Sequence, residues 1–156
     1  MSMRRSVLLV CLGNICRSPL AEAALRREVD RLQLDVGIDS AGTDDWHVGR
    51  PPDRRAIAVA LKNGMDISQF RARHVRAEDF QSFDYIVALD ADNLAYLTKI
   101  RPENGKAELS LLLDHVTGRE GQPVADPYYG HEDEFDVTWS DVTAGAQALA
   151  RKIASM

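Results

Sequence analysis

The chain has 156 residues, 45% of them hydrophobic and 28% charged, which is typical of one globular domain spanning residues 1–156. Its formal net charge of −5, without a basic stripe, argues against nucleic acid as the main partner. No apolar run approaches the roughly 18 residues of a membrane span, and the apolar stretch after Arg5 is too short for a signal peptide. We therefore expect a cytoplasmic protein without a membrane partner.

The first predicted elements are a strand and a helix joined by a short turn. Val7–Val10 are four consecutive apolar residues, which favour a buried strand. The turn contains Gly13 and Asn14, the residue types that best tolerate left-handed backbone. Ser18 and Pro19 favour a helix start, because serine caps helices and proline suits the first helical position. The chain is therefore expected to turn sharply between a strand end and a helix start.

A cysteine and an arginine lie at the two ends of this turn. Cys11 follows the strand and Arg17 precedes the helix. Backbone N–H groups of a tight turn and of a helix N-terminus converge on one point and favour negative charge there. Arg17 adds a planar fork of donors for two oxygens of a phosphate-like group. The same field stabilises a thiolate, so the turn predicts a nucleophile and a phosphate site together.

The following segments predict a parallel crossover. Residues 19–32 form a helix with one apolar face. That face consists of Ala21, Leu25, Val29 and Leu32. A short strand over Val36–Ser40 comes next, and a strand–helix–strand order of this length implies a right-handed parallel connection.

The middle of the chain is predicted to contain one loop, one helix and one irregular connection. Turn-forming residues dominate 44–52, where His47 is interpreted as a solvated loop histidine, with a role in substrate preference as the alternative. A helix is predicted from Asp53 to about Asn63. Its inward residues are expected to be Ala56, Ala60 and Leu61. Residues 67–83 are interpreted as a solvated basic connection in preference to a phosphate-binding patch.

The remaining elements complete an α/β pattern. Asp84–Leu89 is predicted to be a central strand, and Asp90 either caps the next helix, 91–100, or supports a site at that edge of the sheet. Glu108–Leu113 is predicted to be the fourth strand. An apolar stripe then marks the last helix and makes Trp139 a core residue. The stripe consists of Phe135, Trp139, Val142, Ala146, Leu149 and Ile153.

This alternation of strands and helices predicts a doubly wound α/β fold. We expect a single three-layer domain, with a four-stranded parallel sheet and helices on both faces.

A second chemical motif lies between the fourth strand and the last helix. Pro127 stiffens the segment and biases Asp126 toward extended backbone, and Gly130 closes it. Such a segment often marks only a turn. However, thiolate attack on a phosphate monoester needs a proton donor for the leaving oxygen. Asp126 is therefore a candidate acid.

The string CLGNICRSP, Cys11 to Pro19, resembles the active-site loop of low-molecular-weight protein tyrosine phosphatases, and DPYYG, Asp126 to Gly130, is similar to that family's general-acid loop. A C-x5-R spacing alone matches many unrelated chains. The strand before it, the helix after it and the second motif make the combination specific. The resemblance extends from Val7 to the last helix and implies the phosphotyrosine phosphatase I-like fold, a relative of the flavodoxin-like fold.

The resemblance implies a role for each matched residue. Cys11 would attack phosphorus, Arg17 would bind the phosphoryl oxygens, and Asp126 would serve as acid and then as base. The phosphate-binding loop would comprise Leu12, Gly13, Asn14, Ile15, Cys16 and Ser18. Ser18 would also assist departure of the thiolate. The cleft would be lined by Trp46, Tyr128 and Tyr129, while Ser40 would hold Asn14 and Arg73 would form a structural ion pair.

The implied reaction is hydrolysis of phosphotyrosine in a protein through a phosphocysteine intermediate, by a monomeric enzyme without a cofactor. Inorganic phosphate and other oxyanions would inhibit it. No metal is expected, because the four histidines are scattered and none lies one helical turn from another. Cys16 is either a packing residue or a thiol that forms a reversible disulfide with oxidised Cys11.

Four other classes of protein share part of this pattern of a phosphate-binding turn with a nearby cysteine or helix. Thioredoxin-coupled arsenate reductases need further cysteines, and this chain has none after Cys16. Protein-arginine phosphatases resemble C-T-G-N-T-C-R-S in the loop, whereas this chain has the apolar Leu12 and Ile15. A non-enzymatic phosphate-binding module would need neither the thiol nor Asp126. A P-loop nucleotidase is excluded, because G-x4-G-K-[ST] is absent from the sequence.

Overall fold

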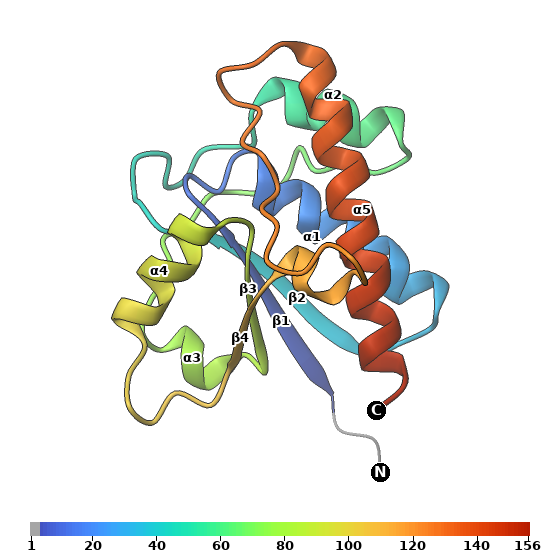
Figure 1. Ribbon diagram of the computed structural model, residues 1–156. Helices are drawn as coiled ribbons and strands as arrows, with labels where there is room; N and C mark the ends of the chain where they lie inside the picture. The colour runs from blue at the N-terminus through green and yellow to red at the C-terminus, as the bar shows by residue number, and fades with distance from the viewer. Residues whose placement is uncertain (1–3) are drawn as a thin grey trace.

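Four parallel strands form the central sheet of the computed structural model, which describes residues 4–156 (Figure 1). The spatial order is β2–β1–β3–β4. The strands are β1 (Arg5–Cys11), β2 (Val36–Gly42), β3 (Tyr85–Ala88) and β4 (Glu108–Leu111). The two central strands are also the most continuously apolar ones, as expected for strands covered on both faces. The predicted α/β class with a four-stranded parallel sheet is confirmed.

Helices cover both faces of the sheet and give three layers. They are α1 (Arg17–Arg31), α2 (Arg54–Lys62), α3 (Asp79–Ser82), α4 (Ala91–Ile100), the 3-10 helix η1 (Leu112–His115) and α5 (Glu132–Ala154). One core cluster joins Val7 and Leu9 of β1 to α1, α2 and α5. A second cluster joins Leu8 and Val10 to α3 and α4. Alternate residues of β1 therefore enter opposite cores, as the two-residue period of a strand requires.

Three sequence predictions need correction. The predicted strand Glu108–Leu113 ends at Leu111, because the carboxylate of Asp114 accepts a hydrogen bond from the Leu111 N–H at 2.9 Å and the chain turns into η1. Leu61 does not face inward: it is 61% exposed, since it lies a further 100° around α2 from the buried Ala60. The segment 67–83 is not merely solvated, because it contains α3 and the fully buried Phe80.

One further observation agrees with the sequence pattern of the last helix. Trp139 is buried on α5, and the guanidinium of Arg27 lies 5.1 Å from the centroid of its ring. Over residues 4–156, no helix is both long and apolar enough to cross a bilayer.

Candidate active site

The turn between β1 and α1 lies at the carboxyl edge of the sheet. β1 ends at Cys11 and α1 begins at Arg17, and both residues are buried. Asn14 has a φ of 57°, the left-handed conformation that the Gly-Asn pair predicts. Cys11 pairs with Gly42 of β2, where a Cβ would lie 2.8 Å from the carbonyl oxygen of Leu12. Glycine therefore lets the turn pass close to β2.

The turn also has free hydrogen-bond donors. Within the described residues, no backbone N–H of residues 12–16 donates to another backbone group outside the regular elements. The fifteen-residue helix α1 begins directly after this turn, so its first N–H groups and the positive end of its dipole lie at the turn as well. The turn is therefore equipped to hold an oxyanion with its main chain.

A chain of hydrogen bonds runs from a buried carboxylate to the thiol of Cys11. Glu22 accepts from Oγ of Ser40 at 2.7 Å, and Ser40 Oγ accepts from Nδ2 of Asn14 at 3.0 Å. The same Nδ2 donates to Oγ of Ser18 at 2.7 Å. Ser18 Oγ lies 3.0 Å from Sγ of Cys11. These contacts connect the turn to α1 and β2.

The carboxylate at the end of this chain decides the direction of each bond. Because a carboxylate only accepts, the hydroxyl hydrogen of Ser40 points to Glu22. The Asn14 amide then donates from Nδ2, while its Oδ1 accepts from the backbone N–H of Arg73 at 3.0 Å. Ser18 Oγ accepts from Asn14, so its own hydrogen can point to the sulfur at 3.0 Å or to the more distant carbonyl oxygen of Ala41 at 3.5 Å. The chain thus presents a donor that stabilises negative charge on Cys11. Burial raises the pKa of Glu22, although the hydrogen bond from Ser40 and the charge of Arg26 oppose the shift.

Arg17 is held by two elements from distant parts of the chain. Its Nη1 donates to Oδ2 of Asp90 at 2.6 Å and to the carbonyl oxygen of Val124 at 3.0 Å. Burial opposes the charge of the guanidinium, but Cys11, Asp90 and Asp126 together raise its pKa, so Arg17 stays protonated. Asp90 fulfils both predicted alternatives, because its other oxygen caps α4 by accepting from the N–H of Asn93 at 2.8 Å.

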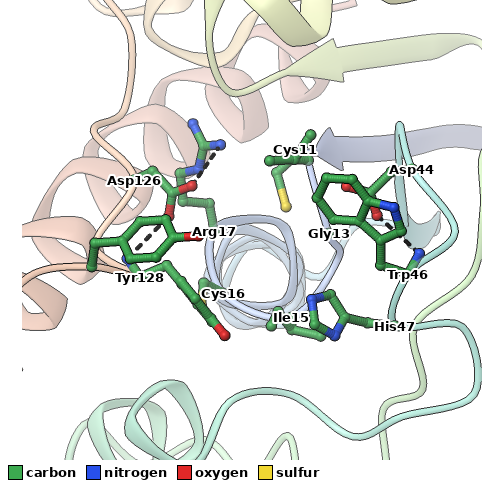
Figure 2. A pocket seen from close by; sticks show the side chains of 12 residues that line it. Cys11, Gly13, Ile15, Cys16, Arg17, Asp44, Trp46, His47, Asp126 and Tyr128 are labelled. Atoms are coloured by element: carbon green, nitrogen blue, oxygen red, sulfur yellow. Dashed lines mark hydrogen bonds and ion pairs between the residues drawn. The ribbon is translucent and has the colours of Figure 1, made fainter.

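Asp126 faces the turn from the segment before α5. Its Oδ2 lies 3.5 Å from Nη2 of Arg17, and its Oδ1 accepts from the N–H of Tyr128 at 3.1 Å. Figure 2 shows Asp126 and Tyr128 on one side of a cleft and Trp46 on the other, with Cys11 between them. The cleft has a volume of about 240 Å³ and is lined by both predicted motifs. The structure therefore brings together Cys11, Arg17 and Asp126.

Aromatic side chains form the rim of the cleft. Trp46 is 74% exposed and Tyr129 95% exposed, so both project into solvent. Tyr128 meets Tyr129 edge to face, with the ring centroids 4.9 Å apart. Ile15 lies lower in the same cleft. These surfaces suit a flat apolar group that enters toward the thiol.

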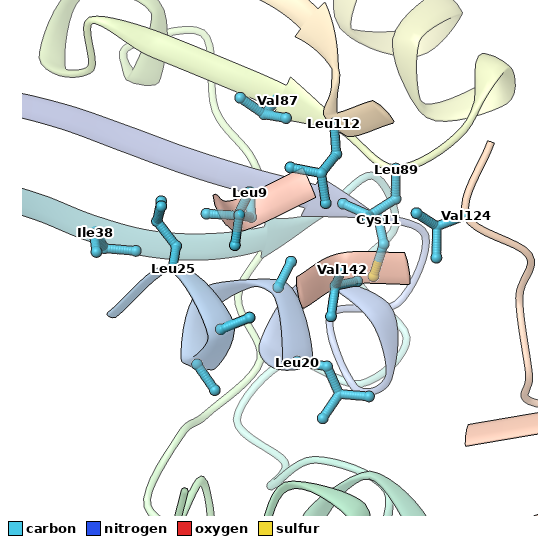
Figure 3. Packing of buried hydrophobic residues seen from close by; sticks show 14 of the residues in the cluster. Leu9, Cys11, Leu20, Leu25, Ile38, Val87, Leu89, Leu112, Val124 and Val142 are labelled. Carbon is cyan, nitrogen blue, oxygen red and sulfur yellow. The ribbon is translucent and has the colours of Figure 1, made fainter. Parts of the chain in front are cut away.

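The floor of the cleft is part of the core. Figure 3 shows Cys11 at the end of β1 beside Leu89, Leu112 and Val124, which belong to the same buried cluster. Cys16 is also buried, and its burial raises the pKa of its thiol, with the charges of Asp53 and Cys11 acting in the same direction. Both cysteines are free.

Sequence reasoning missed several contributors to the site. His47 is not simply a solvated loop residue, because it lines the cleft and its Cδ2 would lie 3.0 Å from a Cβ on Gly13. Glu22 was not recognised, although it follows Ser18 by one helical turn on the buried face of α1. Arg73, by contrast, forms the structural ion pair that the resemblance implies: it pairs with Asp39 and Asp79, each at 3.1 Å, and so anchors the segment that binds Asn14. Over the described residues, no group of three or more His, Cys, Asp or Glu could hold a metal ion.

A thiol on the floor of an oxyanion-binding turn, an arginine at its helix end and a facing carboxyl group are the features of a cysteine-dependent phosphatase. The family model described as "Low molecular weight phosphotyrosine protein phosphatase" matches residues 6–156. The chain belongs to the low molecular weight phosphotyrosine protein phosphatase family.

Individual relatives agree with this assignment. The Schizosaccharomyces pombe low molecular weight phosphotyrosine protein phosphatase is 40% identical, over 99% of this chain and 100% of that protein. A crystal structure of the Entamoeba histolytica protein tyrosine phosphatase with Hepes in the active site has a TM-score of 0.91 and 35% identity, over 97% of each chain. The structure of a Drosophila arginine phosphatase has a TM-score of 0.88 and 30% identity, over 94% of this chain and 96% of that chain.

Proposed function

We propose that this protein hydrolyses phosphotyrosine in proteins through a phosphocysteine intermediate. The observation that carries the proposal is the shared cleft: Cys11 lies on its floor, and Asp126 faces the turn 3.5 Å from the guanidinium of Arg17. Nucleophile, oxyanion donors and acid therefore surround one phosphoryl-sized space.

In the first step, the Cys11 thiolate forms a bond to phosphorus as the bond to the phenolic oxygen breaks. The N–H groups of the turn and the fork of Arg17 bind the three equatorial oxygens and stabilise their charge. Asp126 gives its proton to the departing oxygen, since a phenoxide leaves poorly without one. The products of this step are free tyrosine hydroxyl and phosphocysteine.

In the second step, water attacks phosphorus from the side that the phenol has left, in line with the sulfur, which departs as thiolate on the opposite side. Asp126, now a carboxylate, accepts the proton of the water. The hydroxyl of Ser18, oriented by Asn14, donates to the departing sulfur 3.0 Å away. Inorganic phosphate leaves and Asp126 is protonated again, so the cycle needs no external oxidant or reductant.

Substrate preference is proposed to follow from the walls of the cleft. Trp46, Tyr128 and Tyr129 offer aromatic faces to a phenyl ring, and Ile15 offers an apolar one. A guanidinium would prefer a polar neighbour at the position of Ile15. Phosphoarginine is nevertheless the second candidate, because a Drosophila arginine phosphatase shares the fold at 30% identity.

Turnover of phosphotyrosine, phosphoarginine and arsenate, measured side by side with the same enzyme preparation, tests this proposal. We expect phosphotyrosine to have the highest kcat/KM, and arsenate reduction to be absent because no cysteine follows Cys16. A higher kcat/KM for phosphoarginine would overturn the assignment of the substrate.

We further propose that inorganic phosphate and other oxyanions compete for the turn, that the enzyme acts as a monomer and that it works in the cytoplasm. The Entamoeba relative holds Hepes, which carries a sulfonate, in its active site. A reducing compartment also keeps thiols such as Cys11 in the reduced form that the chemistry requires.

Replacing Cys16 with serine is expected to make inactivation by peroxide harder to reverse. Peroxide converts the thiolate of Cys11 to a sulfenic acid, and the Cys16 thiol can then condense with it to a disulfide and water. Because burial raises the pKa of Cys16, this closure is expected to become faster as the pH rises. The protection by Cys16 is measured as the fraction of activity that dithiothreitol restores after a peroxide pulse, determined at several pH values. Equal recovery in wild type and Cys16→Ser would leave Cys16 a packing residue.

A further inference from the structure

The segment that carries Asp126 has few hydrogen bonds to the rest of the protein. Within 126–130, Tyr128 N–H binds Asp126 and Gly130 N–H donates to the carbonyl of Pro127 at 2.9 Å. Over residues 4–156, the hydrogen bonds that tie this segment to other elements come from Arg55 of α2. Its Nη2 donates to the carbonyl oxygen of Tyr128 at 2.9 Å and its Nη1 to that of Gly130 at 3.3 Å. The ion pair of Asp126 with Arg17 is the other link.

Arg55 is itself fixed on several sides. Its Nε and Nη2 each lie 3.0 Å from a different carboxylate oxygen of Asp53, which is a bidentate pair. Its guanidinium lies 4.7 Å from the ring centroid of Phe135 and 5.7 Å from that of Tyr128. The side chain is only 20% exposed. Arg55 therefore has one conformation imposed by α2, α5 and the aromatic wall of the cleft.

Asp53 carries the connection on to the phosphate-binding turn. Its backbone N–H donates to the carbonyl oxygen of Ile15 at 2.8 Å, and its Oδ1 caps α2 by accepting from the N–H of Arg55 at 2.8 Å. In Figure 1, α2 lies beside the first turns of α5, against which it packs. The pair Asp53–Arg55 thus bridges the turn that holds Cys11 and the segment that holds Asp126.

We propose that Arg55 is a positioning residue for the acid step, acting through the carbonyl groups of Tyr128 and Gly130. This inference rests on the proposed function, in which Cys11 and Asp126 must meet one phosphoryl group at the same time. An error of 1 Å in such an arrangement costs about 100-fold in rate. Lysine cannot replace Arg55, because a single ammonium cannot bind a carboxylate bidentately and reach two carbonyls.

The test is a double-mutant cycle with Arg55→Met and Asp126→Asn. Methionine keeps the unbranched apolar stem against Phe135 and removes every hydrogen bond of the guanidinium, while the backbone N–H of residue 55 still binds Asp53. In the wild-type background, Arg55→Met is expected to lower kcat/KM by about 10- to 100-fold. In the Asp126→Asn background, the same change is expected to cost less than about threefold, because the group that Arg55 positions is already missing. Inhibition by inorganic phosphate is expected to stay within about threefold of wild type in both backgrounds.

Arg54→Met is the matched control, since Arg54 precedes Arg55 on α2 but its side chain is 85% exposed. We expect it to leave kcat/KM unchanged. Equal losses for Arg55→Met in the two backgrounds, or the same loss for Arg54→Met, would overturn the inference. If Arg55→Met melts below the assay temperature, Arg55→Lys is put through the same cycle and judged by the same criterion.

The cycle is run on phosphotyrosine or phosphoarginine, whichever the wild type hydrolyses faster. A preference of the wild type for phosphoarginine contradicts the proposed substrate alone. Additivity in the cycle contradicts the role of Arg55 alone. The two failures are therefore distinguishable.

Discussion

Replacing Cys11 with serine is expected to abolish turnover and to leave phosphate binding intact. The serine hydroxyl stays protonated at neutral pH and is a far weaker nucleophile than a thiolate. The loss in kcat is expected to be on the order of 10⁴-fold or more, about 5.5 kcal/mol of activation free energy. The oxyanion donors are backbone groups and Arg17, which the substitution leaves in place. Turnover of an aryl phosphate, together with calorimetric titration of inorganic phosphate, measures both quantities.

The two readouts separate chemistry from folding. We expect the Kd for phosphate to stay within about threefold of the wild-type inhibition constant. A covalent phosphoryl group on Cys11 should be trapped by rapid quench in the wild type and be absent in Cys11→Ser. Residual activity near wild type would refute the nucleophilic role. Simultaneous loss of phosphate binding would show that the turn itself had been disrupted.

The local features of the site were readable from the sequence because each has a short-range signal. The apolar run Val7–Val10 predicts the central strand, and the Gly-Asn pair predicts the left-handed residue, which is Asn14 at φ 57°. Ser18 and Pro19 predict a helix start within a residue or two of the observed one. Residues that follow one another in the chain form this turn, so no tertiary information was needed.

Contacts between distant segments could not be read in the same way. Arg17 binds the carbonyl oxygen of Val124, 107 positions away, and a main-chain carbonyl has no signature in residue type. Glu22 looks like an ordinary acidic residue near a helix start, where the dipole favours it. Its burial follows from Ser40, 18 positions later, which comes beside α1 only when β2 joins the sheet. Such partners depend on strand order and register.

The same reason explains why Arg55 escaped notice. The stretch Asp53-Arg54-Arg55 shows two equivalent basic residues at a helix start. Only the folded chain distinguishes them, because Arg55 points toward the segment before α5 and Arg54 toward solvent. Residue type alone therefore cannot show that Arg55, and not Arg54, contacts the segment before α5.

Removing the carboxyl group of Asp126 is expected to lower kcat/KM for phosphotyrosine by about 10²- to 10⁴-fold. Phenolic oxygen leaves poorly without a proton, and in the described structure Asp126 is the carboxyl group that lines the cleft on the side of Tyr128. The loss in Asp126→Asn should shrink as the leaving phenol becomes more acidic, since an acidic phenol departs without protonation. The alkaline limb of the pH profile of kcat/KM, which reports the essential acid, should flatten in the variant.

A series of substituted phenyl phosphates measures this dependence directly. Asp133→Asn is the matched control, because Asp133 is an exposed carboxylate in the first turn of α5 and its loss changes the net charge equally. We expect that control to follow the wild-type dependence on leaving group. A loss in Asp126→Asn that is equal for acidic and weakly acidic phenols would mean that Asp126 shapes the cleft electrostatically and donates no proton. Cys16 would not replace it as the donor, because its thiol is buried and burial raises its pKa.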